Sequence, residues 1–133
     1  MLVRISTAFL IATVALPAVA APRADLSVRH SPALDKELAG TVAGKPVDCI
    51  SLPRVRSSMT LSNPDTIIYR IGRTRYVNQP AGGCNLRSDP IIVSQPPSTR
   101  LCRGDIISLV DRSSRFPVGS CGLGSFVPYT PAK

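Results

Sequence analysis

Two kinds of apolar pattern follow one another along the chain. Residues 5–21 form one apolar stretch without a charged residue. From residue 47 onward, apolar and polar positions alternate in short runs, and a period of two is typical of half-buried β-strands. The clearest run is 66–71, with Ile67, Tyr69 and Ile71 on one face and Ile68 and Arg70 on the other. The pattern therefore predicts a β-rich domain behind an apolar N-terminal segment.

Turn residues divide the β-rich part into short strands. Asn63-Pro64-Asp65 and Gly72-Arg73 are turn signals on either side of residues 66–71, and the second predicts a hairpin with 74–78. Other strands are expected at 47–52, at 54–61 as a continuation, and at 91–93, 106–110 and 120–127, the last bent by Gly122 and Gly124. The sequence therefore predicts a mainly β fold, a small antiparallel barrel or sandwich over residues 41–129, followed by a tail at 130–133.

One short helix is expected before the strands, within a segment of leader and helix at 21–40. Ser31 is a good N-cap, Pro32 suits the first helical position, and Gly40 can end the helix. Leu34 and Leu38 would share one face. A helix of this length is unstable alone in water, so it must dock on the β domain.

The first twenty residues predict a secretory signal peptide. One positive charge precedes residue 5, an apolar core follows, and Ala18 and Ala20 form an A-x-A end, so cleavage is expected after Ala20. A membrane-spanning helix needs about 20 strongly apolar residues, whereas this stretch is diluted by Ala and Thr and broken by Pro17. We therefore expect removal of residues 1–20, no membrane span afterwards, and a periplasmic or secreted protein.

Four cysteines, Cys49, Cys84, Cys102 and Cys121, all follow the signal segment. Zinc sites usually place ligands two to four residues apart, a spacing that is absent here. The cysteines therefore predict two disulfides formed in an oxidising compartment. Three pairings are open from the sequence. Of these we favour Cys84 with Cys102, closing a loop across strand 91–93, and Cys49 with Cys121, tying the first core strand to the last.

The charge is strongly positive. The chain has 16 Lys and Arg against 8 Asp and Glu, a net charge of +8, and most of the cations are arginines. The candidate anion-binding residues gather around the predicted hairpin and the strand before it: Arg54, Arg56, Arg70, Arg73 and Arg75. Guanidinium groups pair bidentately with carboxylates and phosphates. The partners this predicts are an acidic envelope component or an acidic protein, since the compartment disfavours nucleic acid. The alternatives are genomic base composition or a solvated face that discourages edge-to-edge strand pairing.

No catalytic constellation, metal motif or cofactor fingerprint is present in the sequence. The single histidine, His30, lies in the expected leader, and the carboxylates that could form a hydrolytic pair, Asp65, Asp89, Asp105 and Asp111, are widely separated. Asp105 lies in a turn, where carboxylates most often bond their own backbone. We therefore expect a non-enzymatic periplasmic binding or interaction module without cofactors. The alternatives are a structural envelope protein without a discrete ligand, or an enzyme of an unrecognised type.

Several short motifs occur in a fixed order between residues 38 and 129. They include Cys49-Ile50, Gly83-Cys84, Leu101-Cys102-Arg103-Gly104-Asp105 and Cys121-Gly122-Leu123-Gly124-Ser125-Phe126. As a set they resemble a family of small exported proteins of Gram-negative bacteria that is catalogued as a domain of unknown function. The resemblance implies one disulfide-bearing β-rich domain behind a signal peptide, and no functional residue carries over from it.

Overall fold

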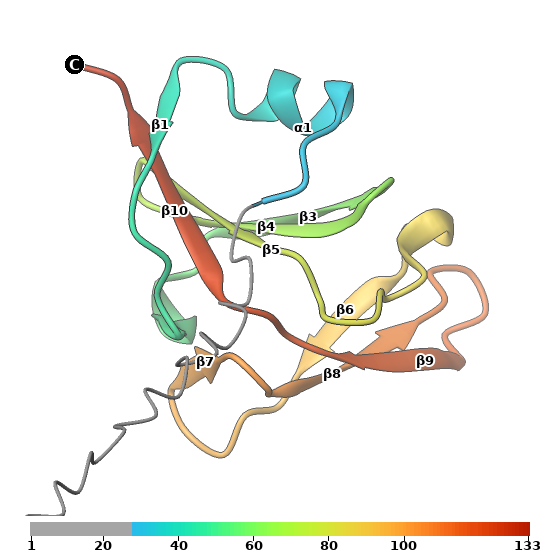
Figure 1. Cartoon of the computed structure of the whole chain (residues 1–133). Helices are drawn as coiled ribbons and strands as arrows, with labels where there is room; N and C mark the ends of the chain where they lie inside the picture. Colours follow the sequence, from blue (N-terminus) through green and yellow to red (C-terminus); the bar gives the residue numbers. More distant parts are fainter. Residues whose placement is uncertain (1–27) are drawn as a thin grey trace, which may run out of the picture.

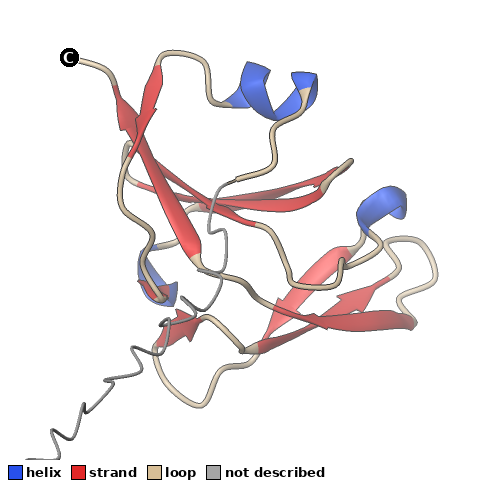
Figure 2. Ribbon diagram, viewed as in Figure 1, coloured by secondary structure: helices blue, strands red, loops and turns tan. Residues whose placement is uncertain are grey.

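The computed structural model describes residues 28–133, and within them the fold is mainly β, with antiparallel sheets and one short α-helix (Figures 1 and 2). The predicted signal peptide at 1–20 and residues 21–27 of the predicted leader lie outside the described residues. The helix is α1 (Pro32–Glu37), and two 3-10 turns are η1 (Leu52–Arg54) and η2 (Leu86–Ser88). The strands are β1 (Thr41–Ala43), β2 (Cys49–Ser51), β3 (Ser57–Ser62), β4 (Asp65–Ile71), β5 (Thr74–Asn78), β6 (Ile91–Ser94), β7 (Arg100–Cys102), β8 (Ile106–Val110), β9 (Pro117–Gly122) and β10 (Phe126–Pro131).

The largest sheet has five strands in the order β1-β10-β5-β4-β3. The predicted β4–β5 hairpin forms, and the predicted alternation of β4 is confirmed. Ile68 packs on the α1 side of the sheet, whereas Ile67 and Tyr69 point into the main core. In Figure 1, α1 lies over one face of this sheet and the remaining strands lie beneath the other.

The predicted helix is confirmed as α1. The Ser31 hydroxyl accepts a hydrogen bond from the backbone N–H of Leu34 at 3.3 Å, which is the N-cap bond expected of serine. Leu34 and Leu38 are both buried, against Val77, Val127 and neighbouring side chains of the five-stranded sheet. Burial of one apolar side, rather than intrinsic helix propensity, holds so short a helix in place.

The main core lies between the five-stranded sheet and two smaller sheets, β6-β8-β9 and β2-β7. Buried side chains from both layers meet there, and the rings of Tyr69 and Phe126 lie 5.8 Å apart between centroids. Leu101, Ile107 and Leu109 complete the core from the second layer. The two strand layers thus share one apolar interior.

The structure corrects several predicted strand boundaries. The run at 47–52 is a strand only over Cys49–Ser51, and residues 54–61 do not continue it, because Pro53 lies in η1 and the chain becomes extended again at Ser57. The predicted strand at 120–127 is two strands, β9 and β10, separated at residues 123–125. β10 then runs to Pro131, into the expected tail, because it pairs with β1 as far as Thr41. β7, whose three residues carry no clear alternation, was not predicted.

Two disulfides are present, as predicted, but the favoured pairing was wrong. Cys49 bonds Cys102 and Cys84 bonds Cys121. Cys49 and Cys102 are directly opposed across the antiparallel β2–β7 pair, with their Cα atoms 4.0 Å apart. That register decides the pairing, and it depends on β7, which the sequence pattern did not reveal.

Candidate functional site

The β4–β5 hairpin brings four of the five candidate arginines together. Arg70 on β4 lies directly opposite Arg75 on β5. The backbone N–H of Arg56 donates to the carbonyl of Arg70 at 2.8 Å, and Arg73 occupies the turn after Gly72, whose φ of +57° suits glycine. We call Arg56, Arg70, Arg73 and Arg75 the hairpin arginines. They form one cationic end of the five-stranded sheet.

Arg54 does not belong to this group in the way the sequence suggested. The predicted strand would place Arg54 and Arg56 on one face, but Arg54 lies in η1 and only Arg56 bonds to the hairpin. The 3-10 turn at Pro53 breaks the alternation on which the expectation depended.

The hairpin arginines have no acidic partner among residues 28–133. One ion pair found there joins Arg112 to Asp89, and the other close contact of this kind joins the His30 imidazole to Asp35. Arg70 and Arg73 are exposed, whereas Arg75 is half-buried, and its Nε is buried without a hydrogen-bond partner in the described part of the chain. The positive charges at this end are therefore not neutralised within the described structure.

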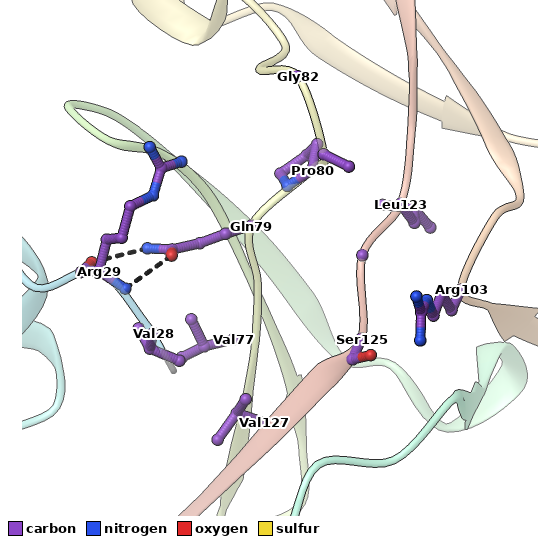
Figure 3. A pocket seen from close by; sticks show the side chains of 12 residues that line it. Val28, Arg29, Val77, Gln79, Pro80, Gly82, Arg103, Leu123, Ser125 and Val127 are labelled. Atoms are coloured by element: carbon purple, nitrogen blue, oxygen red, sulfur yellow. Dashed lines mark hydrogen bonds between the residues drawn. The ribbon is translucent and has the colours of Figure 1, made fainter. Parts of the chain in front are cut away.

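A pocket of about 530 Å³ lies elsewhere, beside the segment that follows β5 and the segment that precedes β10 (Figure 3). Arg29 and Arg103 lie on opposite sides of it, and Val77, Val127 and Leu123 are among its apolar lining residues. We call it the Arg29–Arg103 pocket. Its lining contains no Asp or Glu. Sequence analysis missed both arginines, because they are far apart in the chain and belong to no common motif.

Side-chain amides fix the backbone around this pocket. Gln79 acts like a paired strand residue toward Arg29: its Oε1 accepts from the Arg29 N–H and its Nε2 donates to the Arg29 carbonyl, each at 2.8 Å. The fully buried Asn78 donates to the Gly124 carbonyl at 2.7 Å and accepts from the Gly124 N–H at 3.0 Å. The walls of the pocket are therefore tied to β5 by paired hydrogen bonds.

Asp65 binds backbone rather than a ligand. Its two carboxylate oxygens accept hydrogen bonds from three consecutive backbone N–H groups, those of Cys84 at 2.7 Å, Asn85 at 2.8 Å and Leu86 at 3.1 Å. Burial alone would raise the pKa of Asp65, but these hydrogen bonds and the charge of Arg87 outweigh it and lower the pKa below its usual value of 3.8. The carboxylate is a structural anchor for the loop that carries Cys84.

The other three candidate carboxylates also bond to protein groups, and no two of them form a pair. Asp105 accepts from the Cys102 N–H at 2.7 Å, as a turn carboxylate is expected to do. Asp111 accepts from the backbone N–H and the hydroxyl of Ser114 and from the Ser113 N–H, and these bonds lower the pKa of Asp111. Asp89 pairs with Arg112. Asp105 and Asp111 therefore stabilise the turns in which they lie, whereas Asp89 joins its loop to Arg112 and Thr60 on other segments.

His30 and Asp35 form an exposed pair at the start of α1, with 2.6 Å between His30 Nδ1 and Asp35 Oδ1.

Among residues 28–133, no group of three or more His, Cys, Asp or Glu side chains is placed to hold a metal ion. No helix in the same part of the chain is long and apolar enough to span a membrane.

No protein-family model matches the chain, and neither the curated proteins nor the solved structures that were compared with it include a match. The resemblance to a family of small exported proteins therefore stays a prediction.

Proposed function

We propose that this protein is an exported, non-enzymatic binding module whose hairpin arginines hold an anionic partner. The observation that carries the proposal is the direct opposition of Arg70 and Arg75 on neighbouring strands, with no ion pair from either residue to a carboxylate in the described residues. Like charges directly opposite each other destabilise a sheet. An anion bound between the two guanidinium groups would remove that repulsion.

The position of these strands argues against the simplest structural explanation for the charges. Charged residues often protect the edge of a sheet from pairing with another chain. β4 and β5 are interior strands of the five-stranded sheet, so Arg70 and Arg75 do not guard an edge. The charges therefore need another explanation, and a bound anion supplies one.

The disulfides support an oxidising compartment outside the cytoplasm. Together with the signal peptide predicted at residues 1–20, they support a periplasmic or secreted location. In that compartment the anionic partner would be an acidic envelope component or an acidic protein. Binding rather than catalysis is supported by the four candidate carboxylates, each of which is engaged in hydrogen bonds to backbone or in an ion pair.

Binding of two defined polyanions, polyphosphate and poly-glutamate, to the oxidised chain tests the proposal. We expect saturable binding at low salt that weakens steeply as salt is raised, because the interaction is between exposed charges. Arg70→Gln with Arg73→Gln removes two exposed hairpin charges and leaves Arg75 in place, so the fold is kept and affinity should fall several-fold.

Lys45→Gln with Arg100→Gln is the matched control, because both residues are exposed and the net charge falls by the same amount. Equal loss of affinity in the two double variants would mean that net charge alone attracts the anion, and would overturn the proposal. No saturable binding at low salt would also overturn it and would favour a structural envelope protein. If binding is saturable and depends on the hairpin arginines, affinity capture from native periplasm with the same variants identifies the class of partner.

A further inference from the structure

We propose that the anionic partner is an extended acidic segment of another protein, which adds as a strand to the outer side of β3. The proposal rests on the function proposed above, because the carboxylates of the segment would pair with the hairpin arginines. It goes further by naming the strand and the main-chain bonds that would hold the partner.

β3 is an outer strand of the five-stranded sheet and lies beside β4 (Figure 1). Its six residues, Ser57–Ser62, pair with β4 in one continuous register. Among residues 28–133, the backbone N–H and C=O groups of β3 have no hydrogen-bond partner outside β4. An unpaired row of this kind is a template for pairing with another chain.

The devices by which proteins protect an outer strand are missing from β3. Such strands are usually very short, or carry a charged residue, a proline or a bulge. β3 contains no charged residue and no proline, and its pairing with β4 has no shift in register. By contrast, β1 has three residues and β6 has four, and β9 begins with Pro117 and pairs irregularly with β8. We infer that β3 is kept open for a partner.

Space for a strand is present beside β3. A groove of about 220 Å³ is lined by residues 58–60 of β3 and by residues 90–92 around the start of β6. Its acidic lining residue, Asp89, is already paired with Arg112. The Thr60 hydroxyl donates to Asp89 at 2.9 Å, but Thr60 lies opposite Ile67, whose side chain is in the main core. This bond is therefore made beneath the sheet and leaves the main chain of β3 accessible.

The charges beside β3 select an acidic segment. Ser57 lies directly opposite Arg70, and Arg70 lies opposite Arg75, so a carboxylate placed opposite Ser57 on an added strand would extend the same cross-strand row. Because neighbouring strands are about 4.8 Å apart, the main chains of this residue and Arg70 would be about 10 Å apart, and Glu and Arg side chains span that distance across a serine. The exposed Arg56 adds a cation at the same end of β3.

The same charges argue against a second copy of this chain as the partner. The net charge is +8, and pairing of two β3 strands would bring two sets of hairpin arginines into one sheet. An acidic segment is attracted instead. Met59 lies on the face of the sheet that carries Ser57 and is exposed, so it offers a contact to an apolar side chain. The expected partner is therefore an extended segment with acidic and apolar residues at every second position.

A capped heptapeptide, Glu-Thr-Val-Thr-Val-Thr-Glu, tests the proposal, because its sequence is the same in both directions. Fluorescence anisotropy of the labelled peptide measures its binding to the oxidised chain. We expect saturable binding that weakens several-fold or more when both glutamates are replaced by glutamine. No saturable binding, or equal affinity of the glutamine peptide, would overturn the proposal.

Main-chain pairing also predicts a dependence that charge alone does not. Successive N–H groups of a strand point to opposite sides, so only every second N–H of the peptide would face β3. N-methylation of the two valines, or of the first two threonines, leaves the charge of the peptide unchanged. One of these two peptides should lose affinity by about tenfold or more, because two hydrogen bonds are lost, and the other should retain most of it. The same effect of both modifications would overturn the proposal.

Two matched variants and hydrogen exchange locate the site. Ser57→Glu places a carboxylate beside Arg70 and should abolish peptide binding, whereas Ser57→Gln, of similar size, should retain most of it. Ser57 is exposed, so both variants keep the fold. In the native chain, the peptide should slow the exchange of alternate β3 amides. Equal binding by the two variants, or slowed exchange in β1 or β9 instead, would overturn the proposal. Slow exchange of all β3 amides without peptide would show that the strand is already paired, and would overturn it too.

The polyanion titrations separate failure of this proposal from failure of the proposed function. If the polyanions bind through the hairpin arginines while the two N-methylated peptides behave alike, the proposed function stands and strand addition is wrong. If Arg70→Gln with Arg73→Gln leaves polyanion binding unchanged, the proposed function is wrong and this proposal falls with it.

Discussion

At the scale of single residues, Asp65 links two parts of the chain that are distant in sequence. Its carboxylate, at the start of β4, receives three successive N–H groups of the loop that carries Cys84. Three donors converging on one carboxylate resemble the backbone cradles that proteins build for anions. Here the anion is part of the protein, so the loop is positioned without a ligand.

Replacing Asp65 by Asn should destabilise the fold by about 1–3 kcal/mol, because the amide offers one acceptor oxygen where the carboxylate offers two and carries no charge. Urea denaturation monitored by circular dichroism measures this change. Asp48→Asn is the control, because that side chain is exposed and makes no hydrogen bond within the described residues. Equal stability of the two variants would contradict the structural role of Asp65.

The same carboxylate makes stability depend on pH. Because folding lowers the pKa of Asp65 below 3.8, its contribution is fully present above that value and is lost as pH falls through the lower folded pKa. The native chain should therefore lose stability below about pH 4 more steeply than Asp65→Asn. Parallel pH profiles for the two proteins, from thermal denaturation, would contradict this assignment.

Gly124 is required by a close approach of two backbones. A Cβ atom at this position would lie 2.6 Å from the carbonyl oxygen of Gln79, which cannot move without disturbing β5. Gly124→Ala should therefore destabilise the fold by about 1–3 kcal/mol, the usual cost of overpacking. In Gly122→Ala, the control, the nearest contact is an ordinary 3.7 Å to Ile106. Thermal denaturation of both variants checks the difference, and similar melting temperatures would contradict it.

At the scale of elements, α1 is too short to be stable alone and is held by its packing on the five-stranded sheet. Leu34, on its apolar side, is completely buried there. Leu34→Ala should lower the free energy of unfolding by about 2–5 kcal/mol. Lys36→Ala, on the exposed side of the same helix, should change it little. Denaturation of both variants measures this, and hydrogen exchange of the α1 amides should rise only in Leu34→Ala. A small effect of Leu34→Ala would mean that the helix does not depend on the sheet.

The elements that were predicted correctly are those whose signal is local. α1 has its cap, its first proline and its glycine within ten or so residues, and β4 has strict alternation followed by a turn. Elements that depend on distant partners were missed or misplaced. β7 has only three residues and is a strand because β2 lies beside it, and β10 extends past Val127 because β1 pairs with it.

The candidate sites follow the same division. The hairpin arginines were found because a hairpin gathers residues that are close in sequence. The Arg29–Arg103 pocket was not found, because its two cations come from the segment before α1 and from the turn between β7 and β8. Their proximity follows from the packing of the two strand layers and from the Gln79 and Asn78 bonds, none of which leaves a local sequence pattern.

At the scale of the whole molecule, the two disulfides have different positions. Cys84–Cys121 joins the loop after β5 to the three-stranded sheet, and both of its residues are buried. Cys49–Cys102 joins two paired strands and is only half-buried. Cys49–Cys102 spans 53 residues and Cys84–Cys121 spans 37. The chain-entropy model therefore gives each bond a similar contribution to stability, about 4 kcal/mol.

Solvent access should therefore decide which bond is reduced first. Under mild dithiothreitol at neutral pH, we expect Cys49 and Cys102 to become alkylated before Cys84 and Cys121. Mass spectrometry of timed alkylation measures the order, and the urea-unfolded chain, in which access is equal, is the control. Earlier labelling of Cys84 and Cys121 in the native chain would contradict the burial described here.

The place of β10 in the five-stranded sheet has a consequence for how the protein is made. β10 is synthesised after the other nine strands of the described residues, yet it lies between β1 and β5, so among these residues β1 has no strand partner until β10 has been made. A nascent chain that ends before Phe126 cannot complete this sheet. Completion of the five-stranded sheet is thereby delayed until Phe126–Pro131 has been synthesised, although β1, β3, β4 and β5 all precede it in the chain.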